Sequence, residues 1–144
     1  MKLSRRGALR ALIGAATTLT AAPAFAGSYL NRAALLLHEG RKEADYLRAH
    51  FADKELARII HRLATARVEV ASAMMVPKEV VQAHPHLLLV FESYERAADA
   101  AENGQAERFL VTLQRALDEE RTFRVVLKQL GWEVPGGPDR DRDR

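Results

Sequence analysis

Two histidines flank a proline in the segment QAHPHLLLVF, which covers residues 82–91. Imidazole nitrogens bind metal ions and haem iron, so His84 and His86 could act as ligands if an acidic side chain lies nearby. Pro85 offers a simpler interpretation, because the residue before a proline avoids the helical conformation. A helix would then break at His84 and restart with Pro85 as its first residue, where the missing N–H costs nothing. We therefore expect that the two histidines primarily mark a helix boundary.

No other group of residues predicts a catalytic centre. Ferritin-like di-metal bundles use Glu-x-x-His pairs, and the sequence contains none. The His-Glu-x-x-His motif, a glycine-rich phosphate loop and the Gly-x-Ser-x-Gly motif are also absent. Because the chain has no cysteine, it can form no disulfide, thiolate metal site or covalent c-type haem. The sequence favours a protein that is not an enzyme, and no cofactor is predicted.

The elements that must position these residues are helices. Between Ser28 and Trp132, glycine and proline are sparse and apolar residues recur every three or four positions, which is typical of packed helices. Four segments of about 20–25 residues with short connections predict an all-α, up-down-up-down four-helix bundle, and a helical hairpin that dimerises is the alternative. The expected core residues are Leu30, Ala33, Leu37, Gly40, Ala44, Leu47 and Phe51; Leu56, Ile59 or Ile60, Leu63, Ala66, Val70 and Ala73; Leu87, Phe91, Tyr94, Ala98 and Ala101; and Phe109 or Leu110, Leu113, Ala116 or Leu117, Phe123, Leu127 and Leu130.

The ends of the helices have their own signals. Asp53 is expected to be the N-cap of the second helix. The pair Asn103-Gly104 predicts the end of the third helix, and Gly131 the end of the fourth. Residues 78–83 are expected to form a short separate turn before Pro85.

Three unusual residues fall at about one level of the predicted bundle. Antiparallel pairing of the helices brings Gly40, Arg67 and Glu120 together, with His84 one turn away. Since a buried charge is costly unless paired, we expect an ion pair between Arg67 and Glu120 that fixes the register of the helices. In one alternative, Glu120 reaches the surface at a helix edge.

A second alternative is a metal or ligand site. Glu120 could bind a metal ion together with His84 and possibly His86, with Gly40 leaving room. A non-covalent haem is a further alternative, because Met74 and Met75 end the second helix where the two histidines begin the third.

The first 26 residues have the features of an export signal. Four basic residues and no acid precede a weakly apolar stretch that ends in an A-x-A cleavage site formed by Ala24 and Ala26. The segment SRRGAL, with Arg5 and Arg6, resembles the twin-arginine export motif, although Ala8 stands where the motif usually has phenylalanine. The resemblance implies export in the folded state to the periplasm or beyond, often with a cofactor already inserted.

Removal of this segment changes the charge and sets the domain organisation. The remaining 118 residues carry 18 basic and 19 acidic side chains, so net basicity no longer supports nucleic-acid binding. We expect residues 1–26 as a cleaved signal, 27–132 as the bundle and 133–144 as a disordered charged tail, with no membrane anchor after cleavage. The alanine-rich segment AADAA, residues 97–101, could admit a protein partner or self-association. The leading interpretation is a small periplasmic binding or structural-interaction protein.

Overall fold

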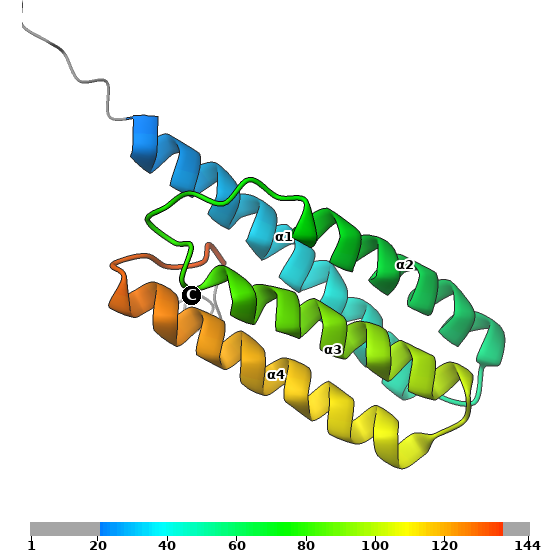
Figure 1. Cartoon of the computed structure of the whole chain (residues 1–144). Helices are drawn as coiled ribbons and strands as arrows, with labels where there is room; N and C mark the ends of the chain where they lie inside the picture. The colour runs from blue at the N-terminus through cyan, green and yellow to red at the C-terminus, as the bar shows by residue number, and fades with distance from the viewer. Residues whose placement is uncertain (1–20, 137–144) are drawn as a thin grey trace, which may run out of the picture.

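The computed structural model describes residues 21–136, with side chains from residue 25, and these residues form four helices whose directions alternate (Figure 1). Helix α1 spans Ala21–Ala49, α2 Lys54–Ser72, α3 His84–Glu102 and α4 Ala106–Gln129. No strand occurs within this range. The prediction of an all-α four-helix bundle is confirmed.

Helix α3 is the centre of the arrangement. Figure 1 shows α3 between α2 and α4, with α1 behind them, and α3 packs more extensively against these two helices than against α1. Its alanine-rich half is buried, and four alanines there are at most 2 % exposed: Ala97, Ala98, Ala100 and Ala101. Small side chains allow helix backbones to approach closely. Helices of the same chain thus cover residues 97–101, the alanine-rich segment that the sequence suggested for contact with a protein partner or for self-association.

The predicted helix ends are largely confirmed. Asp53 caps α2, because its Oδ1 accepts the backbone N–H of Leu56 at 2.9 Å. Gly104 and Gly131 follow the ends of α3 and α4 with φ of 69° and 85°, a left-handed conformation in which a side chain would be strained.

The start of α3 differs slightly from the prediction. Residues 78–83 form turns, as expected, with the N–H of Val80 bonded to the Pro77 carbonyl. His84, however, is the first residue of α3 and not the residue before it, so Pro85 occupies the second helical position. A proline is tolerated there because the first turn of a helix has unpaired N–H groups anyway.

Helix α2 is rotated relative to the predicted core face, which is a correction. Its buried residues are Ala57, Ile60, Ala64, Arg67 and Ala71. Leu63 and Val70, which we expected in the core, are 47 % and 53 % exposed. The small alanines of α2 face the close-packed α3, and the larger apolar side chains of the predicted stripe therefore lie on the outer side.

The packed region extends slightly beyond the predicted domain boundary at residue 132. Val134 is 7 % exposed and belongs to the hydrophobic core, so the first residues of the expected tail pack against the bundle.

The predicted cleavage point after Ala26 lies within α1. Arg5, Arg6 and residues 137–144 lie outside the described range. Across residues 21–136, none of the helices combines the length and the apolar character that crossing a membrane requires.

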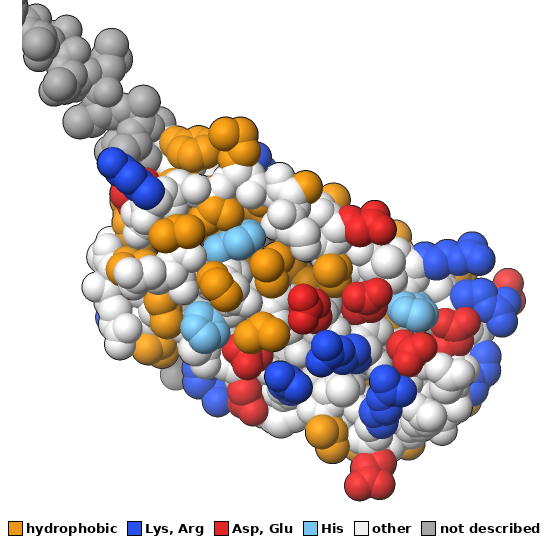
Figure 2. All heavy atoms as spheres, viewed as in Figure 1, with side chains coloured by type: hydrophobic (Ala, Val, Ile, Leu, Met, Phe, Trp, Pro, Cys, Tyr) orange, Lys and Arg blue, Asp and Glu red, His pale blue; other side chains and the backbone are white. Residues whose placement is uncertain are grey.

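Charged side chains of both signs lie on part of the face that Figure 2 shows. Figure 2 shows acidic and basic groups interspersed toward the end of the bundle that holds the α1–α2 and α3–α4 turns. Apolar side chains gather toward the opposite end, near the connection between α2 and α3. Because the signs alternate, this face carries no single-sign field that would steer a strongly charged partner.

Candidate functional site

The predicted ion pair between Arg67 and Glu120 is not formed. Arg67, which is 8 % exposed, donates to Oε2 of Glu43 at 2.7 Å. Glu120, which is 4 % exposed, is bound instead by Arg41 and Arg124. Helix α1 explains the difference, because it presents Glu43 toward α2 and Arg41 toward α4, and so gives each buried charge its own partner.

Gly40 leaves room for a neighbour, as its place in the apolar pattern predicted, and the neighbour is Tyr94. A Cβ atom at Gly40 would lie 3.3 Å from Cδ2 and Cε2 of the Tyr94 ring, and 3.7 Å from Cδ of Arg67. Burial raises the pKa of the Tyr94 hydroxyl to about 12, and the charge of Glu120 acts in the same direction. Tyr94 is therefore a protonated, buried part of the core at neutral pH.

The structure does not bring His84, His86 and Glu120 into one cluster. Nδ1 of His84 lies 2.9 Å from the hydroxyl of Tyr29 on α1, and Nδ1 of His86 lies 3.2 Å from Oε2 of Glu119. Among residues 25–136, no group of three histidine or acidic side chains is placed to hold a metal ion. Each of the three predicted ligands instead contacts a different protein group.

The two methionines of the haem alternative lie at the surface of the α1–α2 hairpin. Met75 is 72 % exposed, and Met74 lines a surface depression together with Leu35 and Val70. His84 faces Tyr29, and burial lowers its pKa, partly opposed by a hydrogen bond with the Ala71 backbone. Neither methionine is paired with a histidine in this arrangement.

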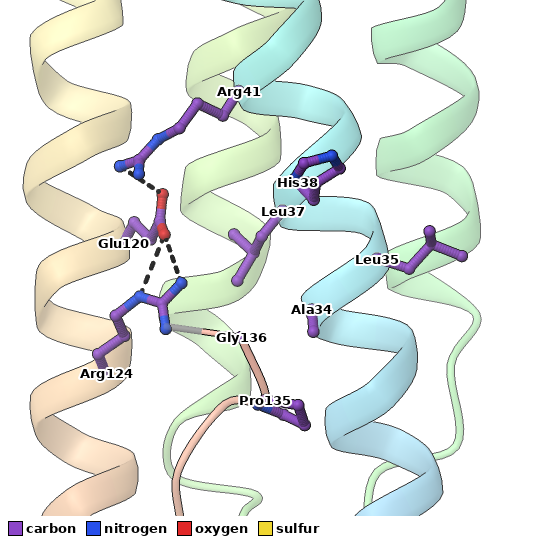
Figure 3. Close-up of a pocket in the computed structure, with 9 residues that line it drawn as sticks. All are labelled: Ala34, Leu35, Leu37, His38, Arg41, Glu120, Arg124, Pro135 and Gly136. Atoms are coloured by element: carbon purple, nitrogen blue, oxygen red, sulfur yellow. Dashed lines mark hydrogen bonds and ion pairs between the residues drawn. The ribbon is translucent and has the colours of Figure 1, made fainter. Parts of the chain in front are cut away.

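A groove runs between α1 and α4, and it contains a cluster of three charged side chains, Arg41, Glu120 and Arg124 (Figure 3). Its volume is about 390 Å³, within the range of small-molecule pockets. Helix α1 forms one wall, α4 the other, and the segment after α4 closes one end. The lining residues are Ala34, Leu35, Leu37, His38, Arg41, Glu120, Arg124, Pro135 and Gly136.

Two guanidinium groups meet one carboxylate in this groove. Nε and Nη2 of Arg124 lie 3.1 and 2.8 Å from Oε1 of Glu120, and Nη2 of Arg41 lies 3.2 Å from Oε2 (Figure 3). The side chains of Arg41 and Arg124 remain 47 % and 29 % exposed, although that of Glu120 is only 5 % exposed. Two positive charges against one negative charge leave a net positive charge facing the groove. Each guanidinium has five N–H donors, so donors remain for a second anion.

The opposite end of the groove is apolar. Ala34 of α1 and Pro135 of the final segment lie together there, with Leu37 between them and the charged cluster (Figure 3). The groove thus combines a cationic end with an apolar end. That arrangement is suited to a ligand that carries one acidic group on a hydrocarbon body.

Sequence reasoning identified Glu120 but missed both arginines. Arg124 follows Glu120 by four residues, a spacing at which side chains on one helix pair, so the sequence contained an indication of this contact. The sequence contained no indication of the contact between Arg41 and Glu120, because this contact depends on how α1 is rotated relative to α4. His38 is exposed, and it also lines the groove.

No family model matches the chain, and comparisons with curated proteins and with solved structures give no match. Its function must therefore be argued from the geometry of the groove and from the surface of the helices.

Proposed function

We propose that this protein is an exported binding protein of the periplasm, and that the groove between α1 and α4 takes an organic acid with an apolar body. One observation carries the proposal: Arg41 and Arg124 share a single buried carboxylate and keep exposed N–H groups on the groove. Glu120 holds both guanidinium groups in place, so little side-chain entropy is lost when an anion binds. The apolar end formed by Ala34, Leu37 and Pro135 would cover the hydrocarbon part.

The chemistry of the groove favours binding over catalysis. Arginine stays protonated at any physiological pH, so neither guanidinium can serve as a general base. The carboxylate of Glu120 is already paired with two guanidinium groups, those of Arg41 and Arg124. The groove therefore offers charge and shape complementarity to an acid.

Calorimetry with straight-chain carboxylates tests the proposal. Octanoate and dodecanoate should bind, whereas acetate should not, because only the longer chains reach the apolar end. Octanol and octyltrimethylammonium, which lack the acidic group, should bind more weakly or not at all. Arg124→Gln keeps one donor for Glu120 but removes the charge, and it should weaken carboxylate binding about tenfold or more, as expected for a charge-assisted hydrogen bond.

A matched control comes from the same helix. Arg121→Gln changes an exposed arginine whose partner is Asp118, outside the groove, and should leave the affinity unchanged. Equal effects of the two substitutions, or affinity that does not depend on chain length, would contradict the groove as the binding site.

Export rests on the features of residues 1–26 and is tested separately. If Arg5 and Arg6 direct the chain to the twin-arginine route, replacing both with lysine should retain the protein in the cytoplasm with its signal uncleaved. Cell fractionation and the mass of the protein measure this outcome. Continued export of the Lys-Lys variant would indicate the general secretory route instead, and a cytoplasmic wild-type protein would refute export.

A further inference from the structure

The outer face of α2 carries an apolar stripe that no described part of the chain covers. The side chains of Ile59, Leu63 and Val70 are 53 %, 47 % and 53 % exposed, and the exposed alanines Ala66 and Ala73 lie between and beyond them. We call these five residues the α2 stripe. Contiguous exposed apolar surfaces on a small protein commonly mark an interface.

The spacing within the α2 stripe is that of a helix–helix seam. Successive members are four, three, four and three residues apart, which is the heptad pattern of the a and d positions in a coiled coil. The inner face of α2 has its own seam, formed by Ala57, Ile60, Ala64, Arg67 and Ala71, and this face packs inside the bundle. Helix α2 therefore carries two packing seams, and residues 21–136 use one of them for packing within the chain.

The size and the charge of the residues point to one occupant. In an antiparallel pairing of two α2 helices that cross at Ala66, the small Ala66 side chains meet each other on a two-fold axis. Leu63 of one copy then lies beside Val70 of the other, and the large Ile59 lies opposite the small Ala73. The two surfaces are thus complementary in shape when the same stripe pairs with itself, as a two-fold interface requires.

The charged residues beside the stripe favour the same arrangement. Arg62 and Glu69 are both exposed and flank the stripe on its polar side, at the heptad position called g when Leu63 and Val70 are a. In the antiparallel pairing, Arg62 of each copy lies near Glu69 of the other, which gives two complementary pairs. A parallel pairing would instead place Arg62 near Arg67, a like charge, and Arg67 is already buried against Glu43.

We propose that two copies of this protein form an antiparallel dimer through the α2 stripe, with the two-fold axis at Ala66. The interface extends from α2 onto α1, where Leu35 is 60 % exposed and shares a surface depression with Val70 and Met75. This extension matters, because a stable interface buries about 800 Å² on each partner, more than one helix face supplies. The α2 stripe itself contributes no residue to the groove, although Leu35, onto which the interface extends, also lines it.

Light scattering combined with size exclusion measures the dimer directly. The protein without its signal should be dimeric at high micromolar concentration, and Leu63→Glu should make it monomeric without changing its helical circular dichroism. Leu110→Glu is the matched control, because Leu110 is 50 % exposed on α4, away from the stripe, and its substitution should leave the dimer intact.

A charge exchange tests the antiparallel direction. Arg62→Glu alone and Glu69→Arg alone should each weaken the dimer, since each creates two like-charge contacts across the axis. The double variant with both changes should restore it. Failure of the double variant to recover affinity, when each single change has lowered it, would overturn the antiparallel pairing.

Cysteine cross-linking locates the axis, because the natural chain contains no cysteine. Ala66→Cys should form an intermolecular disulfide with itself on mild oxidation. Ile59→Cys and Ala73→Cys should cross-link poorly alone but efficiently when the two variants are mixed. A monomer at every concentration tested, a dimer that Leu63→Glu leaves intact, or equal self-linking at all three positions would overturn the proposal.

Discussion

Arg67 and Glu120 are the buried charged side chains of the described core, and each is neutralised by a partner that is more exposed than itself. This arrangement confines most of the desolvation cost to one member of each pair. Helix α1 supplies the partner in both cases, through Glu43 and Arg41. Removal of a partner should therefore cost more than replacement of the whole pair, since a buried charge would be left without compensation.

The pair of Arg67 and Glu43 allows this asymmetry to be measured. Glu43→Ala should lower the free energy of unfolding by about 3 kcal/mol, because Arg67 stays buried without its carboxylate. The double variant Glu43→Leu with Arg67→Met should unfold at nearly the wild-type denaturant concentration. The exposed pair of Asp118 and Arg121 is the control, and its removal should change stability by less than about 0.5 kcal/mol. Urea unfolding followed by circular dichroism measures all of these, and small equal effects for the single and double variants would contradict a buried pair.

At the scale of the helices, the sequence predicted where the helices end and which faces of α1, α3 and α4 are buried, but not how α2 is rotated. Asp53, Gly104 and Gly131 act through their own backbone and local hydrogen bonds, so their roles are visible in the sequence. The rotation of α2 depends on what faces it. The sequence pattern favoured Leu63 and Val70 for the core because they are larger and more apolar than Ala57 and Ala64.

The structure selects the alanine face of α2 because α3 is also lined with alanines where the two helices meet. Close contact between two small-residue faces leaves no space for Leu63 or Val70. Periodicity in a single sequence cannot reveal such pairwise complementarity. The same limit explains why only part of the candidate site could be predicted. Glu120 was recognisable in the sequence as an acid among apolar residues, but its contact with Arg41 depends on the placement of α1 beside α4.

At the scale of the whole molecule, His84 joins the beginning of α3 to α1 through Tyr29. Burial raises the pKa of the Tyr29 hydroxyl far above its usual value, so Tyr29 keeps its proton and can donate it to the unprotonated Nδ1 of His84. The neutral form of His84 is therefore the one that fits this contact between α1 and α3. A change of protonation here affects the packing of two helices and not a single surface group.

Stability should consequently fall as the pH drops below about 6.5, the ordinary pKa of histidine. Burial lowers the pKa of His84 in the folded state, so the unfolded chain takes up the proton first, and acid favours unfolding. Urea titrations at several pH values should show this loss beginning near neutrality and continuing until the folded state also binds the proton. The carboxyl of Glu102, whose pKa is lowered mainly by its hydrogen bond with His61, adds a further loss only in a more acidic range.

A substitution at His84 separates its contribution to the pH dependence of stability from that of Glu102. His84→Gln keeps an acceptor for the Tyr29 hydroxyl but cannot titrate, so it should flatten the pH dependence of stability between neutrality and about pH 5, where histidine ordinarily changes charge. His38→Gln, at an exposed position on α1, should retain the wild-type slope. If both variants keep that slope, the proton uptake that destabilises the bundle does not occur at His84.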